Sequence, residues 1–167
     1  MDTRRGKEDY YLDIADAVLN RSTCLRRKYG AIIVRNDEIL STGYNGAPRG
    51  RANCCELGYC VREQMQVPRG ERYELCRSVH AEANAIISAA RRDMVGGTLY
   101  LAGKDAATGA ILPDATSCSM CRRMIINAGL EKVVIRTSPQ DYVVVPVREW
   151  IDQDDSLPLR PGMEDNA

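Results

Sequence analysis

A histidine, a glutamate and two cysteines stand at spacings that suit metal-assisted chemistry. His80 is the only histidine of the 167-residue chain, and Glu82 follows it by two residues in the motif H-A-E. Cys118 and Cys121 are three residues apart at the start of a second predicted helix. Residues three apart share one helix face, so both thiolates can point at one atom. One imidazole and two thiolates form a three-ligand set that suits zinc.

This ligand set predicts a catalytic rather than a structural zinc, because three protein ligands leave the fourth position open. A helix N-terminus lowers the pKa of a thiol and so favours the thiolate that zinc binds. Water at the open position becomes acidic enough to supply hydroxide near neutral pH. Glu82 is close to the metal without being needed as a ligand, so we interpret it as the group that hands a proton to a leaving nitrogen. A core histidine with two buried cysteines is the alternative, and the ordered second half of the motif argues against it.

Helices and strands that position these residues are predicted to alternate along the chain. Helices are expected over 8–20, 78–92 and 116–130, with Ser78 capping the second and Gly129 ending the third. Strands are expected over 30–34, 38–44, 96–103, 131–137 and 142–147, the first two joined by a turn at Asn36 and Asp37. This order favours an α/β layer fold whose sheet is mostly parallel after an initial hairpin.

Several motifs between about residue 8 and residue 136 resemble those of one enzyme family. H-A-E followed downstream by C-x-x-C is a signature of zinc-dependent nucleobase deaminases. The segment GYNGAPRG at 43–50 and the cysteine four residues before His80 are similar to one branch of that group. The chain therefore resembles the deoxycytidylate (dCMP) deaminase family of the cytidine deaminase superfamily. The resemblance implies a three-layer α/β/α cytidine deaminase-like fold with a five-stranded mixed sheet.

The same resemblance implies zinc-dependent hydrolytic deamination of dCMP to dUMP with release of ammonia. In that family's pattern, His80, Cys118 and Cys121 hold the catalytic zinc, and Glu82 is the catalytic acid and base. Two alternatives stay open: deamination of another pyrimidine base, nucleoside or modified nucleotide, and a catalytically silent zinc- or nucleotide-binding subunit. We expect a small-molecule nucleotide as substrate and a homo-oligomer as the assembled state.

Substrate contacts and two departures from the family pattern also follow from the resemblance. Tyr44 and Asn45 of the GYNG segment resemble a nucleotide-contacting element, and Arg26 is a further candidate for substrate binding. Ser117 stands where proline usually precedes the first cysteine of C-x-x-C, although serine can cap the same helix. The last part of the chain does not match the family, and Tyr142 is its candidate for a base-contacting aromatic residue.

A second, structural zinc is expected beside the segment 45–76, which is rich in Gly, Pro, Arg and Cys and lacks clean periodicity. A loop of this length inside a compact domain needs something to hold it in place. The resemblance implies a structural zinc in this region, and only cysteines remain as ligands. The four candidates are Cys24, Cys54, Cys60 and Cys76. Cys55 is left over and can exchange roles with Cys54, and free buried thiols without metal are the alternative.

Several arginines lie close to these cysteines in the sequence. They either offset the charge of a four-thiolate zinc site, bind a substrate phosphate, or form a solvated basic surface. The five arginines are Arg26, Arg27, Arg51, Arg62 and Arg77.

Composition and charge limit the remaining possibilities. The formal net charge is zero, which argues against a nucleic-acid partner. The N-terminal segment is charged and has no long apolar run, so we expect no signal peptide, no membrane span and a cytoplasmic location. Thiols stay reduced there, which favours metal ligation over disulfides. We expect a deaminase domain over 1–150 and a polar tail over 151–167, with loose packing from Glu149 onward.

Overall fold

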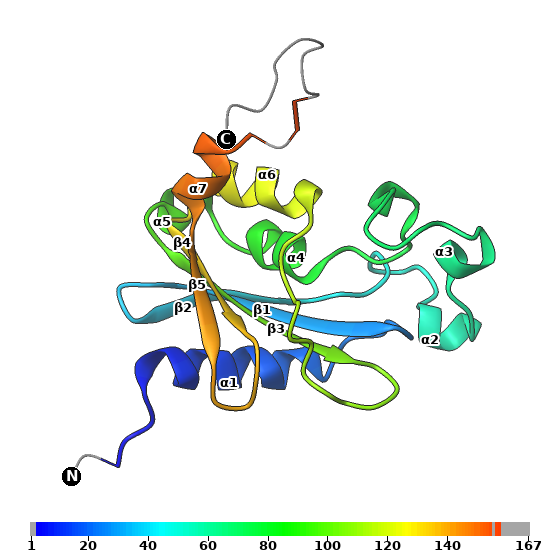
Figure 1. Cartoon of the computed structure of the whole chain (residues 1–167), viewed down its shortest axis with the longest axis horizontal. Coiled ribbons are helices and arrows are strands. Elements are labelled where there is room, and N and C mark those ends of the chain that lie inside the picture. The colour runs from blue at the N-terminus through cyan, green and yellow to red at the C-terminus, as the bar shows by residue number, and fades with distance from the viewer. Residues whose placement is uncertain (1–2, 155, 158–167) are drawn as a thin grey trace, which may run out of the picture.

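A five-stranded mixed sheet lies between two layers of helices in the computed structural model, which describes residues 3–154, 156 and 157 (Figure 1). Helix α1 (Lys7–Leu19) covers one face, and helices α4 (Ala81–Ile87), α6 (Ser119–Ala128) and α7 (Val147–Asp152) lie on the other (Figure 1). The strand order is β2-β1-β3-β4-β5. The strands are β1 (Arg27–Arg35), β2 (Glu38–Tyr44), β3 (Thr98–Asp105), β4 (Lys132–Arg136) and β5 (Tyr142–Pro146). The expected three-layer α/β/α fold is confirmed.

The pairing of the strands differs from the mostly parallel sheet that the order of elements suggested. Only β3 and β4 pair in parallel among the described strands, and the other three pairings are antiparallel. The connection through α4 does join two parallel strands, β2 and β3, but β1 lies between them in the sheet. The short loop between β4 and β5 permits only an antiparallel pair. Alternation of elements therefore predicted the layers but not the neighbours within the sheet.

The helix predicted over 78–92 is shorter and broken. Val79 is held in an extended bridge to Gly46, with backbone hydrogen bonds of 2.7 and 3.2 Å, so α4 begins at Ala81 and His80 is its N-cap in place of Ser78. The Ser88 hydroxyl donates to the Asn84 carbonyl at 2.9 Å where α4 ends, an alternative to continuing the helix. A separate short helix, α5 (Arg91–Met94), follows.

Short helical turns occupy the segment 45–76, for which the sequence predicted no helix or strand. They are α2 (Cys54–Leu57), α3 (Val61–Gln64) and the 3₁₀ turn η1 (Tyr73–Leu75).

At the other end of the chain, the loose tail expected from Glu149 is instead part of α7, whose Trp150 packs against the core. Residues 155 and 158–167 of that expected tail lie outside the described residues. None of the described helices has the length and apolar character needed to cross a lipid bilayer.

The helix that carries His80 and Glu82 lies against the sheet through a glycine. A Cβ at Gly43 of β2 would lie 2.3 Å from the Ala81 carbonyl oxygen and 2.4 Å from the Ala85 amide nitrogen. Both contacts are with backbone atoms of α4, which cannot rotate away as a flexible side chain would. The absence of a side chain at Gly43 therefore sets how closely α4 approaches the sheet.

We predict that Gly43→Ala lowers the free energy of unfolding by about 1–3 kcal/mol, because overpacking displaces α4 from β2. Urea unfolding measures this change. Gly6→Ala is the matched control, since a Cβ there would meet its nearest neighbour, Asp9 Oδ2, at an ordinary 3.5 Å. Equal stability of the two variants would contradict the close approach.

Candidate active site

Three side chains from two helix starts gather into one potential metal site. His80 Nδ1 lies 3.4 Å from Cys118 Sγ and 3.4 Å from Cys121 Sγ. All three ligand atoms lie within 4.8 Å of one another, the only such cluster of three or more His, Cys, Asp or Glu within the described part of the chain. The imidazole and thiol donors, their number and their closeness fit a zinc ion with one open position.

The local backbone explains why these three residues meet. His80 is the N-cap of α4 and Cys118 is the N-cap of α6, and both residues have extended backbone conformations. Their side chains therefore leave the chain where each helix begins, and the two helices begin close together at the same end (Figure 1). Cys121 lies one turn into α6 on the same face and is fully buried.

The three donors of the cluster shift one another's pKa values in opposite directions. Hydrogen bonds from Cys121 and His80 outweigh burial and lower the pKa of the Cys118 thiol to about 4. Burial lowers the pKa of His80, but hydrogen bonds to Cys118 and Cys76 raise it to about 10. The thiolate of Cys118 and its burial raise the pKa of Cys121. A divalent cation bound here would displace the protons of His80 and Cys121, because metal ligands must be deprotonated.

Glu82 is held beside this cluster with its carboxyl group buried. Only 5% of the residue is exposed, and burial raises the pKa of its carboxyl group, although its own backbone amide and the charge of His80 oppose that effect. A carboxyl group with a raised pKa can both accept and return a proton near neutral pH. Glu82 lies in the first turn of α4, close to the cluster of His80, Cys118 and Cys121 but not part of it.

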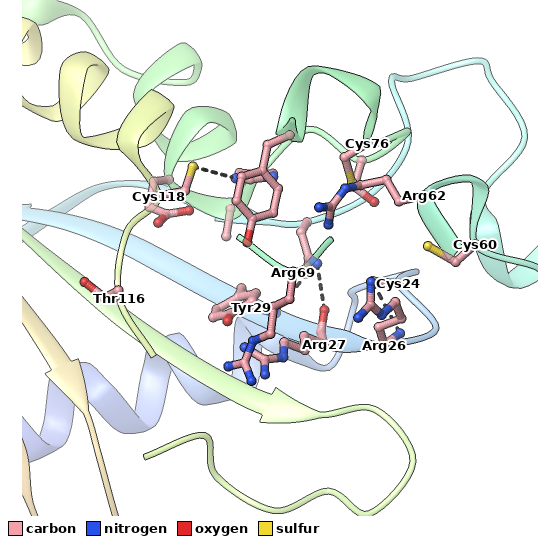
Figure 2. A pocket seen from close by; sticks show the side chains of 16 residues that line it. Cys24, Arg26, Arg27, Tyr29, Cys60, Arg62, Arg69, Cys76, Thr116 and Cys118 are labelled. Atoms are coloured by element: carbon pink, nitrogen blue, oxygen red, sulfur yellow. Dashed lines mark hydrogen bonds between the residues drawn. The ribbon is translucent and has the colours of Figure 1, made fainter. Parts of the chain in front are cut away.

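A pocket opens next to His80, Glu82 and Cys118 (Figure 2). Two tyrosines and four arginines form much of its wall. These six residues are Tyr29, Tyr73, Arg26, Arg27, Arg62 and Arg69. The pocket therefore joins the buried carboxyl group of Glu82 and two members of the potential metal site to a region of positive charge.

Two of the four residues predicted to contact the substrate line the pocket. Asn45 and Arg26 line the pocket, but Tyr44 and Tyr142 are not among its lining residues. Asn45 Oδ1 accepts hydrogen bonds from the Tyr29 amide at 2.8 Å and the Ser22 hydroxyl at 2.5 Å, so its side chain organises the pocket wall. Tyr142 opens the edge strand β5 and is 38% exposed.

The sequence did not single out the aromatic wall of the pocket or Arg69. The Tyr73 ring meets the His80 ring edge-on at 5.3 Å, and the Arg62 guanidinium lies 4.5 Å from the centre of the Tyr73 ring. Arg62 is buried and donates to the carbonyl oxygens of Pro68 and Glu71, which shapes the loop around Tyr73. The loop has no periodicity, so only its mixture of tyrosine and arginine beside the H-A-E motif could have suggested these contacts.

The four cysteines of the expected second site lie near one another, but they are further apart than the ligand atoms of the first cluster. Cys24, Cys60 and Cys76 line the pocket, and within the described ranges no three of the four sulfur atoms lie within 4.8 Å of each other. Burial raises the pKa of Cys54, and the neighbouring thiols of the other three raise it further. Cys55 points to solvent, so Cys54 is the one of that pair that faces the group.

This fold and ligand set are typical of zinc-dependent nucleobase deaminases. The family model for the cytidine and deoxycytidylate deaminase zinc-binding region matches residues 5–137, and the chain belongs to that family.

Individual relatives are consistent with this membership. The deoxycytidylate deaminase of Mycobacterium phage D29 is 37% identical over 137 residues, which cover 79% of this chain and 95% of the relative. The Schizosaccharomyces pombe deoxycytidylate deaminase is 34% identical over 135 residues and 81% of this chain. This chain spans 38% of that yeast protein and 39% of its Saccharomyces cerevisiae counterpart.

Solved structures agree at the level of the fold. The apo dCMP deaminase of cyanophage S-TIM5 is 29% identical with a TM-score of 0.55, covering 80% of this chain and 84% of the phage chain. A second structure of that enzyme holds dCMP and dUMP, at 28% identity and a TM-score of 0.54. The cytidine deaminase of Burkholderia pseudomallei, at 18% identity and a TM-score of 0.53, shares the fold.

We predict that Cys121→Ser releases the zinc held at this cluster, because it removes the buried one of three ligands. Zinc per chain, measured by atomic emission after dialysis, falls by one equivalent. Cys55→Ser is the matched control, since that thiol is exposed and outside the cluster. Full zinc retention by Cys121→Ser would contradict the assigned ligand set.

Proposed function

We propose that the chain catalyses hydrolytic deamination of dCMP to dUMP and ammonia. The observation that carries the proposal is the buried carboxyl of Glu82 beside the His80, Cys118 and Cys121 cluster, at one end of an arginine-lined pocket. Membership of the cytidine and deoxycytidylate deaminase family supports this chemistry. The phage relative solved with dCMP and dUMP supports the choice of nucleotide.

The residues of the site divide the reaction between them. When bound by His80, Cys118 and Cys121, zinc supplies the Lewis acidity that makes a water molecule nucleophilic. Glu82 accepts one proton from that water and passes it to N3 of the pyrimidine as the water oxygen bonds to C4. It then carries the remaining hydroxyl proton to the 4-amino nitrogen, so that the C4–N bond breaks and ammonia leaves. The low polarity that raises the pKa of Glu82 matches this exchange, because the same group must hold and release a proton.

Positive charge in the pocket suits the 5′-phosphate of a nucleotide. Arg69 forms an ion pair with Asp114, and both Arg69 and Arg27 lower the pKa of that carboxyl group. Arg27 also lowers the pKa of the Asp105 carboxyl group. Among the described residues its guanidinium forms no direct ion pair, so it can still donate to a phosphate. Arg26 is less available, because its Nε is 2.9 Å from a carboxylate oxygen of Glu63. We therefore place the phosphate near Arg27 and Arg69, and Arg26 further out.

We also propose a second, structural zinc bound by Cys24, Cys54, Cys60 and Cys76. Three of these residues line one pocket, and the charges of their thiolates act on Cys54. Zinc ligation would draw the sulfur atoms together and hold the segment 45–76 against the body of the domain. The same zinc analysis tests this site: two equivalents per chain in the unaltered protein and one in Cys24→Ser support it, whereas one in the unaltered protein refutes it.

The assembly and location of the protein stay predictions. A homo-oligomer is supported by large apolar side chains at the surface, including Ile87 on α4 and Val144 on β5, which are 68% and 47% exposed. Sedimentation velocity decides between a monomer and a larger assembly. A nucleotide substrate and reduced thiols suit a cytoplasmic location.

We predict that Glu82→Gln lowers kcat for dCMP by about 10²–10⁴-fold, because the amide cannot accept and return a proton. Ammonia release, measured by a coupled assay, reports the loss, and zinc content stays at the level of the unaltered protein. Glu38→Gln removes an exposed carboxylate at the start of β2 and serves as the control. Normal turnover by Glu82→Gln would contradict the mechanism. If the unaltered, zinc-loaded protein binds dCMP but releases no ammonia, the alternative of a catalytically silent subunit is favoured.

We predict that Arg27→Met raises KM for dCMP about 10–100-fold, because a charge-assisted hydrogen bond to phosphate contributes about 1.5–3 kcal/mol. The kinetic constants for deoxycytidine, which has no phosphate, change little. Arg21→Met, at an exposed position after α1, is the matched control. Selective turnover of bases or nucleosides without phosphate by the unaltered protein would replace dCMP with another pyrimidine substrate.

A further inference from the structure

Two departures from the family pattern meet at one side chain in the structure. The first is Ser117, which stands where proline usually precedes the C-x-x-C motif. The second is α7, which lies beyond the matched residues 5–137. Arg122 of α6 contacts both, because its Nε donates a hydrogen bond to the Ser117 carbonyl at 3.0 Å and its guanidinium lies 5.0 Å from the centre of the Trp150 ring.

Ser117 and Trp150 are themselves held in place. Ser117 is 1% exposed and lies two residues before α6 begins at Ser119. Trp150 packs against the core on the α4 and α6 face of the sheet. The first residue of α7, Val147, is 3% exposed, and its amide donates to the Glu131 carbonyl at 2.9 Å. The guanidinium thus joins a fixed ring on α7 to a carbonyl on the loop before the first cysteine ligand.

The Ser117 carbonyl belongs to the peptide group that leads directly into Cys118. Fixing this carbonyl fixes the plane of that peptide, and with it the direction in which the Cys118 side chain leaves the backbone. A proline at position 117 would restrict the same stretch covalently, through its ring and its fixed φ angle. Serine has no ring, so a non-covalent contact must supply the restriction.

We propose that Arg122 and Trp150 are positioning residues that clamp the loop before Cys118 and hold its thiolate in the geometry that the metal requires. The clamp takes the place of the missing proline and gives α7 a role in the active site. Stacking on Trp150 orients the planar guanidinium, and the oriented Nε–H holds the carbonyl. The inference rests on the proposed function only in taking His80, Cys118 and Cys121 as zinc ligands.

The test measures zinc release and metal geometry in Arg122→Met and Trp150→Leu. We expect zinc transfer to a chromophoric chelator to be about tenfold faster or more in both variants, because contacts that support a metal ligand typically contribute 10–100-fold to metal affinity. In cobalt(II)-substituted protein, the thiolate charge-transfer and d–d bands change shape. Arg123→Met is the matched control, since it removes a positive charge from the next, exposed position of α6 and leaves the clamp intact.

Rescue by proline separates positioning from general stability. Within residues 3–154, the Ser117 amide donates no hydrogen bond, so proline there removes none. We expect Ser117→Pro in the Arg122→Met background to restore most of the zinc retention and the cobalt spectrum. Should Arg122→Met fail to fold, Arg122→Lys serves in its place, because lysine keeps the charge and the stem but lacks the planar donor.

The outcomes distinguish this proposal from the proposed function. Zinc release and cobalt spectra in the Arg122 and Trp150 variants that equal those of Arg123→Met overturn the clamp, whether or not the unaltered protein deaminates dCMP. Faster release without rescue by Ser117→Pro also overturns it, because the contact then serves stability alone. Faster release with rescue supports the clamp even if the unaltered protein does not act on dCMP, and in that case only the proposed function fails.

Discussion

The convergence of two helix starts on one point is the constraint on which the rest of the structure depends. His80 opens α4 and Cys118 opens α6, and their ligand atoms come within 3.4 Å. Helix α4 precedes β3, with the short α5 between them, and α6 precedes β4. Because β3 and β4 are parallel, α4 and α6 run in the same direction and begin at the same end of the sheet. The sheet thus brings together donors that are 38 residues apart in the chain. Without this alignment, the H-A-E and C-x-x-C motifs are two unrelated local patterns.

Close packing of α4 against the sheet fixes where this helix begins. Gly43 lets α4 lie directly on β2, and the bridge between Gly46 and Val79 stops the helix from starting earlier than Ala81. These contacts place Glu82 in the first turn, buried beside the ligands. Burial then raises the pKa of the carboxyl group, as the proposed proton transfer requires.

Positive charge is concentrated at the pocket, although the chain as a whole is neutral. The chain is formally neutral, yet four arginines line the pocket beside the metal cluster. Arg69 forms an ion pair with Asp114, whereas Arg27 lowers the pKa of both Asp114 and Asp105 without a direct ion pair to either. The clamp at Arg122 uses a further arginine in a different way, as an oriented donor that connects α7 to the loop before Cys118.

The sequence by itself determined the features that depend on short spacing. The i, i+3 pair of Cys118 and Cys121, the position of Glu82 two residues after His80, and the β1–β2 hairpin all follow from local geometry, which the nearest residues dictate. Tertiary structure alone decided which strands are neighbours, since β1 separates β2 from β3 and alternation of elements carries no information on that order. It also decided that Tyr73 and Arg69 reach the pocket while Tyr142 does not. Those contacts come from an aperiodic loop and an edge strand, whose positions depend on packing against residues far away in the chain.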